Sequence, residues 1–165
     1  MRDDEQTWPG ITFLLPYYDA SGVFGWDATE NLVETPKRNY TVLDYKQLFQ
    51  DSNWTAGYAM RQDGQYVIPG MFAPNVEVMC VHGSGFNTKM VMVYQNQYDF
   101  PNGNPTTIRV NGDGEITLNS LSACLRFADM QIQKFTYKVF PGFSHVGILN
   151  EPEFLLYLED YLKAL

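Results

Sequence analysis

Two absences narrow the functions open to this chain. It has only 11 Lys and Arg against 19 Asp and Glu, a formal net charge of −8, and no cluster of basic residues. Because binding to phosphates needs clustered Lys and Arg, this balance argues against a nucleic-acid partner. No apolar run reaches the ~20 residues needed to span a bilayer. The opening MRDDEQTWPG also has no apolar core of a signal peptide.

A third absence is the GxSxG pentapeptide. Hydrolases of the α/β type carry their nucleophilic serine in this motif, and the serine is followed in the chain by an acid and then by a histidine. The motif does not occur here, yet Asp113 in NGDGEIT and His145 in PGFSH stand in that order. A carboxylate behind a histidine holds the imidazole in one tautomer and stabilises its protonated form. The sequence therefore predicts the acid and base of a serine hydrolase, without the nucleophile.

Two other interpretations of NGDGEIT compete with the catalytic one. The segment matches several positions of an EF-hand calcium loop, but the first ligand would then be Arg109 and the twelfth Ser120. A cation at the first position and no bidentate Glu at the last argue against calcium. The other interpretation is a plain glycine-rich turn, because N-G and D-G pairs are common in turns. The presence of His145 favours the catalytic interpretation.

The two histidines stand in different contexts. His145 follows the strand-like FTYKVF and lies in a predicted loop, and loops on rigid scaffolds often carry chemistry. His82 precedes the predicted loop Gly83-Ser84-Gly85. A catalytic pair of His82 with Ser84 is disfavoured, because side chains at this spacing rarely face each other productively and Ser84 lacks the flanking residues of the elbow.

Apolar periodicity predicts an α/β chain forming one domain over residues 1–165. Strands are expected at 76–81, 90–94 and 135–140, and a turn at 101–105. Helices are expected after the capping pair Thr41 and Asp44, at 54–60, along a stripe from Leu118 to Ala128, and after Asn150. The final helix has Glu151 and Glu153 in its first turn, and its apolar face is Phe154, Leu158, Tyr161 and Leu165. Alternating strands and helices imply parallel β/α units.

The first thirty residues show no clean period and are expected to form a loop-rich edge. Their aromatic residues suit either a core or the wall of a lipid tunnel, and these are Trp8, Phe13, Tyr17, Tyr18, Phe24 and Trp26. Both interpretations stay open at this stage.

Two cysteines and two sequons bear on the compartment. Cys80 and Cys124 are either a disulfide that ties a helix to the sheet or two buried thiols. Asn39 in NYT and Asn53 in NWT are candidate glycosylation sites. A disulfide and sequons suit a secretory compartment, whereas no signal peptide is recognisable. We therefore expect the natural beginning of the protein to be absent from this chain.

The order of five segments resembles the carboxyl half of the lecithin–cholesterol acyltransferase family, most of all its lysosomal, group XV phospholipase A2 branch. The segments are TPKRNYTVLDYKQLFQDSNWTAGYAMRQD, VEVMCVHGSG, NGDGEIT, the cysteine of the following helix and PGFSHVGIL. The resemblance runs from about Trp8 to the end of the chain. The chain departs from the family at Glu115, where relatives often have Thr, and at Ser144, where an acidic or amide residue is usual.

The resemblance implies the C-terminal half of an α/β-hydrolase fold, with an incomplete parallel sheet. It places the catalytic acid at Asp113, the catalytic histidine at His145, a disulfide at Cys80 and Cys124, and a glycan at Asn39. It implies transfer of a phospholipid acyl chain through a serine acyl-enzyme to water or a lipid alcohol, at a membrane or lipoprotein surface, with no cofactor, in a lysosomal or extracellular protein. The alternative is a non-catalytic fragment or pseudoenzyme that binds lipid or a partner.

Overall fold

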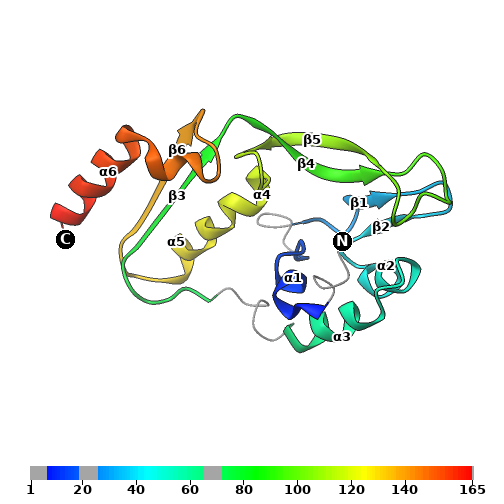
Figure 1. Cartoon of the computed structure of the whole chain (residues 1–165). Coiled ribbons are helices and arrows are strands. Elements are labelled where there is room, and N and C mark those ends of the chain that lie inside the picture. Colours follow the sequence, from blue (N-terminus) through cyan, green and yellow to red (C-terminus); the bar gives the residue numbers. More distant parts are fainter. Residues whose placement is uncertain (1–6, 19–25, 65–71, 165) are drawn as a thin grey trace. The chain divides into compact units, whose positions relative to one another are not determined.

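The protein is a mixed α/β chain in which a computed structural model describes residues 7–18, 26–64 and 72–164 (Figure 1). Its residues group into two compact units. Unit 1 comprises residues 1–72 and 91–108, and unit 2 comprises residues 73–90 and 109–165. Among the described residues, no helix has the length and apolar character needed to cross a membrane.

Unit 2 is built on two parallel strands, β3 (Val78–Ser84) and β6 (Phe135–Pro141). The chain between them includes α4 (Leu118–Leu121), the 3-10 helix η2 (Ser122–Arg126) and α5 (Phe127–Met130). This order confirms the predicted parallel β/α unit. The predicted loop at residues 83–85 is wrong in part, because β3 continues through Ser84, which pairs with Pro141.

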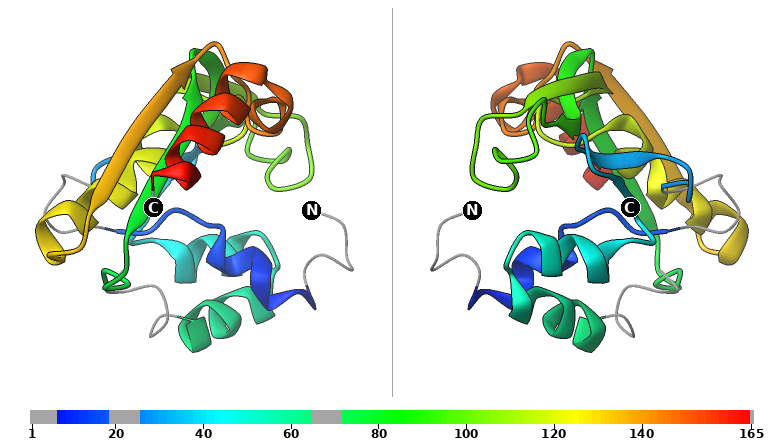
Figure 2. Two further views of the ribbon diagram at one scale, coloured as in Figure 1. Left: turned by 90° about the vertical axis from the view of Figure 1, so that its left-hand side faces the viewer. Right: turned by 90° about the vertical axis from the view of Figure 1, so that its right-hand side faces the viewer.

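Helices cover both faces of the β3–β6 pair. The views in Figures 1 and 2 place α6 (Pro152–Lys163) on one face and the segment from α4 to α5 on the other. Because side chains alternate along a strand, Val81 packs toward α6 whereas its neighbour Cys80 is bonded to Cys124 of η2. Phe140, Ile148 and Phe154 form the buried cluster on the α6 side.

The helices of unit 2 differ from prediction at their ends. The single helix expected from Leu118 to Ala128 is divided into α4, η2 and α5, and Cys124 lies in the 3-10 part. Asn150 does not cap α6, since it ends the 3-10 helix η3 (Gly147–Asn150). The helix α6 begins at Pro152, because the fixed φ of proline suits the first position of a helix. The N-cap residue is therefore Glu151, which precedes it. Leu165 lies outside the described residues.

Unit 1 combines helices with the strands of a mixed sheet. Its helices are α1 (Pro9–Phe13), α2 (Tyr45–Asp51) and α3 (Thr55–Gly64). Strand β1 (Asn31–Glu34) pairs antiparallel with β2 (Asn39–Thr41) and parallel with β4 (Phe86–Val93). The sheet order is β2-β1-β4-β5, where β5 is Thr106–Gly112. Strands β4 and β5 contribute residues to both units.

Several predictions for unit 1 are confirmed. Helices α2 and α3 occur where they were expected, and the Asp44 carboxylate accepts hydrogen bonds from both the backbone N–H and the hydroxyl of Thr41. The strand predicted at 90–94 belongs to β4, which begins earlier, at Phe86. Of the early aromatic residues, Trp26 is buried whereas Trp8 and Phe13 are exposed. Phe24 lies outside the described residues.

Candidate active site

Asp113 lies directly after β5, in a turn that surrounds its carboxylate with donors. Its Oδ1 accepts hydrogen bonds from the backbone N–H groups of Glu115 and Ile116, at 3.1 and 2.8 Å. The Asp113 N–H donates to the carbonyl of Ile116, so the turn closes on itself. The side chain is only 3% exposed. The segment NGDGEIT is therefore a turn that orients an acid. This result combines the interpretation as a glycine-rich turn with the interpretation as the position of the acid.

His145 lies after β6, in a loop that is fastened at several points. Gly142 N–H donates to the carbonyl of Ser84 at the end of β3, and Ser144 Oγ accepts from Gly147 N–H. His145 N–H itself donates to the carbonyl of Asp113 at 2.9 Å. A backbone hydrogen bond therefore joins the Asp113 turn to the His145 loop, in addition to any contact between the side chains.

The side chains of Asp113 and His145 are joined directly. His145 Nδ1 lies 2.8 Å from Asp113 Oδ2, within hydrogen-bond range. The imidazole is 46% exposed, in contrast to the buried carboxylate. With Nδ1 donating to the carboxylate, Nε2 is the ring nitrogen left to exchange a proton with another group.

The acid of this pair is held in its ionised form. Burial by itself would raise the pKa of Asp113, but the hydrogen bonds from Ile116 N–H, His145 and Glu115 N–H outweigh it and lower the pKa below its ordinary value. Asp113 therefore remains a carboxylate, which can accept the Nδ1 proton, throughout the neutral and mildly acidic range.

Sequence reasoning missed a residue that supports the Asp113 turn. Thr88 of β4 is fully buried, and its hydroxyl accepts from Gly114 N–H at 2.9 Å while donating to the carbonyl of Phe86. Gly114 has a φ of +101°, a conformation that side chains disfavour. Only the D-G pair signalled the turn, and nothing in the local sequence around Thr88 indicated its role.

A close approach between backbones fixes the second loop against β3. A Cβ added at Gly83 would lie 1.8 Å from the carbonyl oxygen of Phe143. Only a residue without a side chain allows the two segments to meet this closely. The predicted loop glycine is thus a strand glycine that lets the His145 loop lie against β3.

The other histidine is engaged elsewhere. His82 is buried, with Nδ1 at 2.8 Å from the carbonyl of Gly83 and Nε2 at 2.7 Å from the hydroxyl of Tyr137. Both ring nitrogens therefore have partners other than Ser84. His82 links β3 to β6, and the sequence interpretation that set aside a pair with Ser84 agrees with these contacts.

The cysteines form the disulfide that the resemblance implied. Cys80 and Cys124 are bonded, with 6.5 Å between their Cα atoms and 44 residues between them in sequence. The two sequon residues, Asn39 at the start of β2 and Asn53 after α2, are both exposed. No group of three or more His, Cys, Asp or Glu side chains that could hold a metal occurs in the described part of the chain.

Asn53 also has a structural use. It has a φ of +58° and its N–H donates to the carbonyl of Gln50, at the point where α2 ends. Asparagine is one of the few residues that adopt this conformation readily, so it suits a helix end. Its exposure keeps it accessible for modification as well.

Comparison with known proteins identifies the relatives of the chain. No family model matches it. It is 32% identical over 98% of its length to lysosomal phospholipase A and acyltransferase of Bos taurus, covering 38% of that protein. The Homo sapiens protein of the same name is 29% identical over 98% of the chain, which covers 37% of it. Phosphatidylcholine-sterol acyltransferase of Gallus gallus is 30% identical over 75% of the chain, which covers 30% of it.

The match covers most of this chain but only part of each relative. It runs along nearly the whole chain for the lysosomal proteins, whereas the chain spans less than two fifths of the length of any of the three. This similarity agrees with the resemblance to the lecithin–cholesterol acyltransferase family that the sequence motifs carry.

Proposed function

We propose that this chain supplies the acid and base of a serine-dependent lipid acyltransferase or phospholipase A. The observation that carries the proposal is the Asp113–His145 pair, with a 2.8 Å contact and an imidazole that is 46% exposed. A buried carboxylate behind an accessible imidazole is the arrangement that activates a hydroxyl nucleophile. The names of the relatives, phospholipase and acyltransferase, indicate the class of substrate.

The chemistry follows from the two side chains. His145 Nε2 removes the proton of a serine hydroxyl as its oxygen attacks the ester carbonyl of a phospholipid, and Asp113 stabilises the imidazolium that forms. The imidazolium then returns the proton to the departing glycerol oxygen, leaving an acyl-enzyme. In the second half, His145 deprotonates water or a lipid alcohol, whose oxygen takes the acyl chain from the serine. The imidazolium then returns the proton to the departing serine oxygen. The serine and its oxyanion hole come from outside these 165 residues.

The same proposal covers fold, surroundings and compartment. The parallel β3–β6 unit forms the C-terminal part of an α/β-hydrolase sheet, with both catalytic residues on loops that follow strands. The partners are a phospholipid and a lipid-alcohol acceptor at a membrane or lipoprotein surface, without a cofactor or nucleic acid. The disulfide suits a lysosomal or extracellular protein, as do glycans at Asn39 and Asn53.

A chimaera tests the proposal. The 165 residues replace the matching segment of the Bos taurus relative, which retains its own remaining sequence. We expect the chimaera to hydrolyse a phospholipid and to be labelled by a serine-directed fluorophosphonate, because the pair then has a nucleophile to activate. His145→Ala should abolish turnover. His82→Ala is the matched control, because His82 is engaged by Gly83 and Tyr137 rather than by an acid.

The outcomes separate the proposal from its alternative. Turnover that survives His145→Ala would contradict the proposal. A chimaera that unfolds cooperatively yet has no activity would favour a non-catalytic role in binding lipid or a partner. Labelling of the isolated chain on Ser84 or Ser144 would show that the nucleophile lies inside these residues after all.

A further inference from the structure

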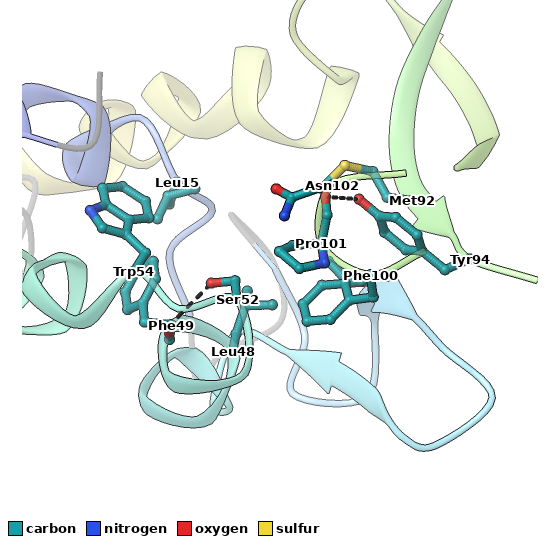
Figure 3. A pocket seen from close by; sticks show the side chains of 11 residues that line it. Leu15, Leu48, Phe49, Ser52, Trp54, Met92, Tyr94, Phe100, Pro101 and Asn102 are labelled. Carbon is teal, nitrogen blue, oxygen red and sulfur yellow. Dashed lines mark hydrogen bonds between the residues drawn. The ribbon is translucent and has the colours of Figure 1, made fainter. Parts of the chain in front are cut away.

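Unit 1 contains an apolar cavity that the proposed chemistry does not use. Its volume is about 410 Å³, which is within the range of small-molecule sites. Figure 3 shows Trp54 and Phe49 on one side of it and Phe100, Tyr94 and Met92 on the other. The walls come from the α2–α3 region, from β4 and from the loop after β4, so that the cavity forms only when these distant segments fold together.

Each of the two walls of the cavity contains an aromatic pair. Phe49 and Trp54 pack edge to face with 4.9 Å between their ring centres, and Tyr94 and Phe100 do the same at 5.2 Å. Phe49, Trp54 and Tyr94 are all buried. Aromatic pairs in this geometry are favourable, so contacts between its own rings stabilise each wall.

The polar groups of the cavity are mostly committed to the protein. Ser52 Oγ donates to the carbonyl of Phe49 at 3.2 Å, and Tyr94 donates its hydroxyl hydrogen to the carbonyl of Pro101 at 3.1 Å. Among the residues that the structure describes, no Lys, Arg, His, Asp or Glu lines the space. A ligand carrying a charge would therefore lose its hydration here without gaining a partner.

The Asn102 amide is the polar group that the cavity offers to a ligand. Figure 3 shows its side chain directed toward the space between the two walls. An amide can donate to an ester or carboxyl oxygen. The site thus combines long apolar walls with a single neutral hydrogen-bonding group, which suits a molecule that is aliphatic along most of its length.

We propose that unit 1 binds one aliphatic chain of a lipid in this cavity, with the Asn102 amide toward its oxygen-bearing end. The identification of the ligand as a lipid rests on the proposed function, whereas the apolar character of the site rests on the walls alone. The described residues that line the cavity all belong to unit 1, whereas Asp113 and His145 belong to unit 2.

Tryptophan fluorescence of the intact 165-residue chain tests the proposal without any catalytic step. The probe is methyl 9,10-dibromostearate, an uncharged ester used below its solubility limit, because bromine quenches an indole at contact distance. We expect saturable quenching that methyl stearate reverses. Trp54→Phe should remove most of the quenching, whereas Trp8→Phe should preserve it, since Trp8 is 56% exposed and does not line the cavity.

A charge introduced at the rim gives an independent test. Met92 lines the cavity and is 44% exposed, so Met92→Lys can be accommodated at the surface of β4. It should weaken binding about tenfold, because the ammonium must lose water when the chain enters. Asn87→Lys places the same charge on an exposed position of β4 outside the cavity and should leave binding unchanged.

Equal quenching in Trp54→Phe and Trp8→Phe, or equal binding by Met92→Lys and Asn87→Lys, would overturn the proposal and assign the lipid to another surface. Failure of the chimaera to transfer acyl groups with binding intact would reject the catalytic proposal alone. Absence of saturable quenching in the isolated chain, together with an active chimaera, would reject only the proposal that the cavity binds lipid.

Discussion

The two units of the molecule organise their candidate sites in different ways. In unit 2, backbone groups set the geometry: two N–H groups and one imidazole hold the Asp113 carboxylate, and a backbone contact joins its loop to that of His145. In unit 1, side-chain volume sets the geometry, because paired rings define the cavity and its polar groups mainly satisfy the protein. The comparison sets the proposed proton-transfer site, which backbone hydrogen bonds position, against the proposed binding site, which packed rings shape.

The largest effect that would sharpen this comparison is on turnover. Asp113→Asn in the chimaera should lower the rate by roughly 10⁴-fold, because an amide stabilises the wrong tautomer of His145. Quenching by methyl 9,10-dibromostearate should be unchanged in the same variant of the isolated chain. Steady-state kinetics and fluorescence titration measure the two. A loss of lipid binding equal to the loss of rate would contradict the separation of the sites.

A core substitution in unit 1 should have the largest effect on stability. Phe49 is 2% exposed and packs against both Tyr45 and Trp54. Phe49→Ala should reduce the free energy of unfolding by about 3–5 kcal/mol, because it deletes a buried ring and enlarges the cavity. Urea denaturation measures the loss. Leu43→Ala is the control, since Leu43 is 62% exposed, and a similar loss there would argue against a cavity maintained by ring packing.

Unit 2 should respond most to a change at its backbone contact. Gly83→Ala places a methyl group 1.8 Å from the carbonyl oxygen of Phe143, so the His145 loop must move. We expect a loss of about 1–3 kcal/mol in unfolding free energy and a lower rate in the chimaera. Gly10→Ala is the matched control, because the added Cβ meets nothing within 4 Å. Normal activity in Gly83→Ala would show that the contact does not position His145.

The smallest effect concerns pH. The folded state lowers the pKa of Asp113 below the 3.8 of an ordinary aspartate. Its carboxylate therefore stabilises the folded state fully above that value, and the contribution is lost as the pH falls through the lower, folded pKa. Urea midpoints of the wild-type chain and Asp113→Asn should converge as the pH is lowered below 3.8. A difference that grows with acidity would contradict the depressed pKa.

The sequence predicted the features that short, continuous segments encode. Asp113 and His145 were predicted because each lies in a short glycine-containing motif and the two occur in the order of acid and histidine found in α/β hydrolases, and Cys80 and Cys124 because a resemblance paired them. The parallel strands β3 and β6 were predicted from runs rich in β-branched and aromatic residues. The end of β3 was not, since Gly83-Ser84-Gly85 was expected to be a loop, and the close approach of Phe143 to Gly83 is visible only in the structure.

The features that were missed depend on contacts between distant segments. Strands β1 and β2 are only four and three residues long, too short for a clear alternation. Thr88 gave no signal, because its partner Gly114 lies 26 residues away. The cavity of unit 1 is lined by residues that lie between Leu15 and Asn102 in the sequence, and aromatic composition alone could not distinguish its wall from a filled core.

The most direct test of the central claim, that Asp113 and His145 act as one catalytic unit, is a double-mutant cycle on turnover in the chimaera. When two residues act as one unit, substituting the second causes little further loss of rate once the first has been substituted. The account predicts that Asp113→Asn combined with His145→Ala is no slower than His145→Ala alone. Losses that multiply in the double variant would contradict it, because Asp113 would then act on the reaction independently of His145.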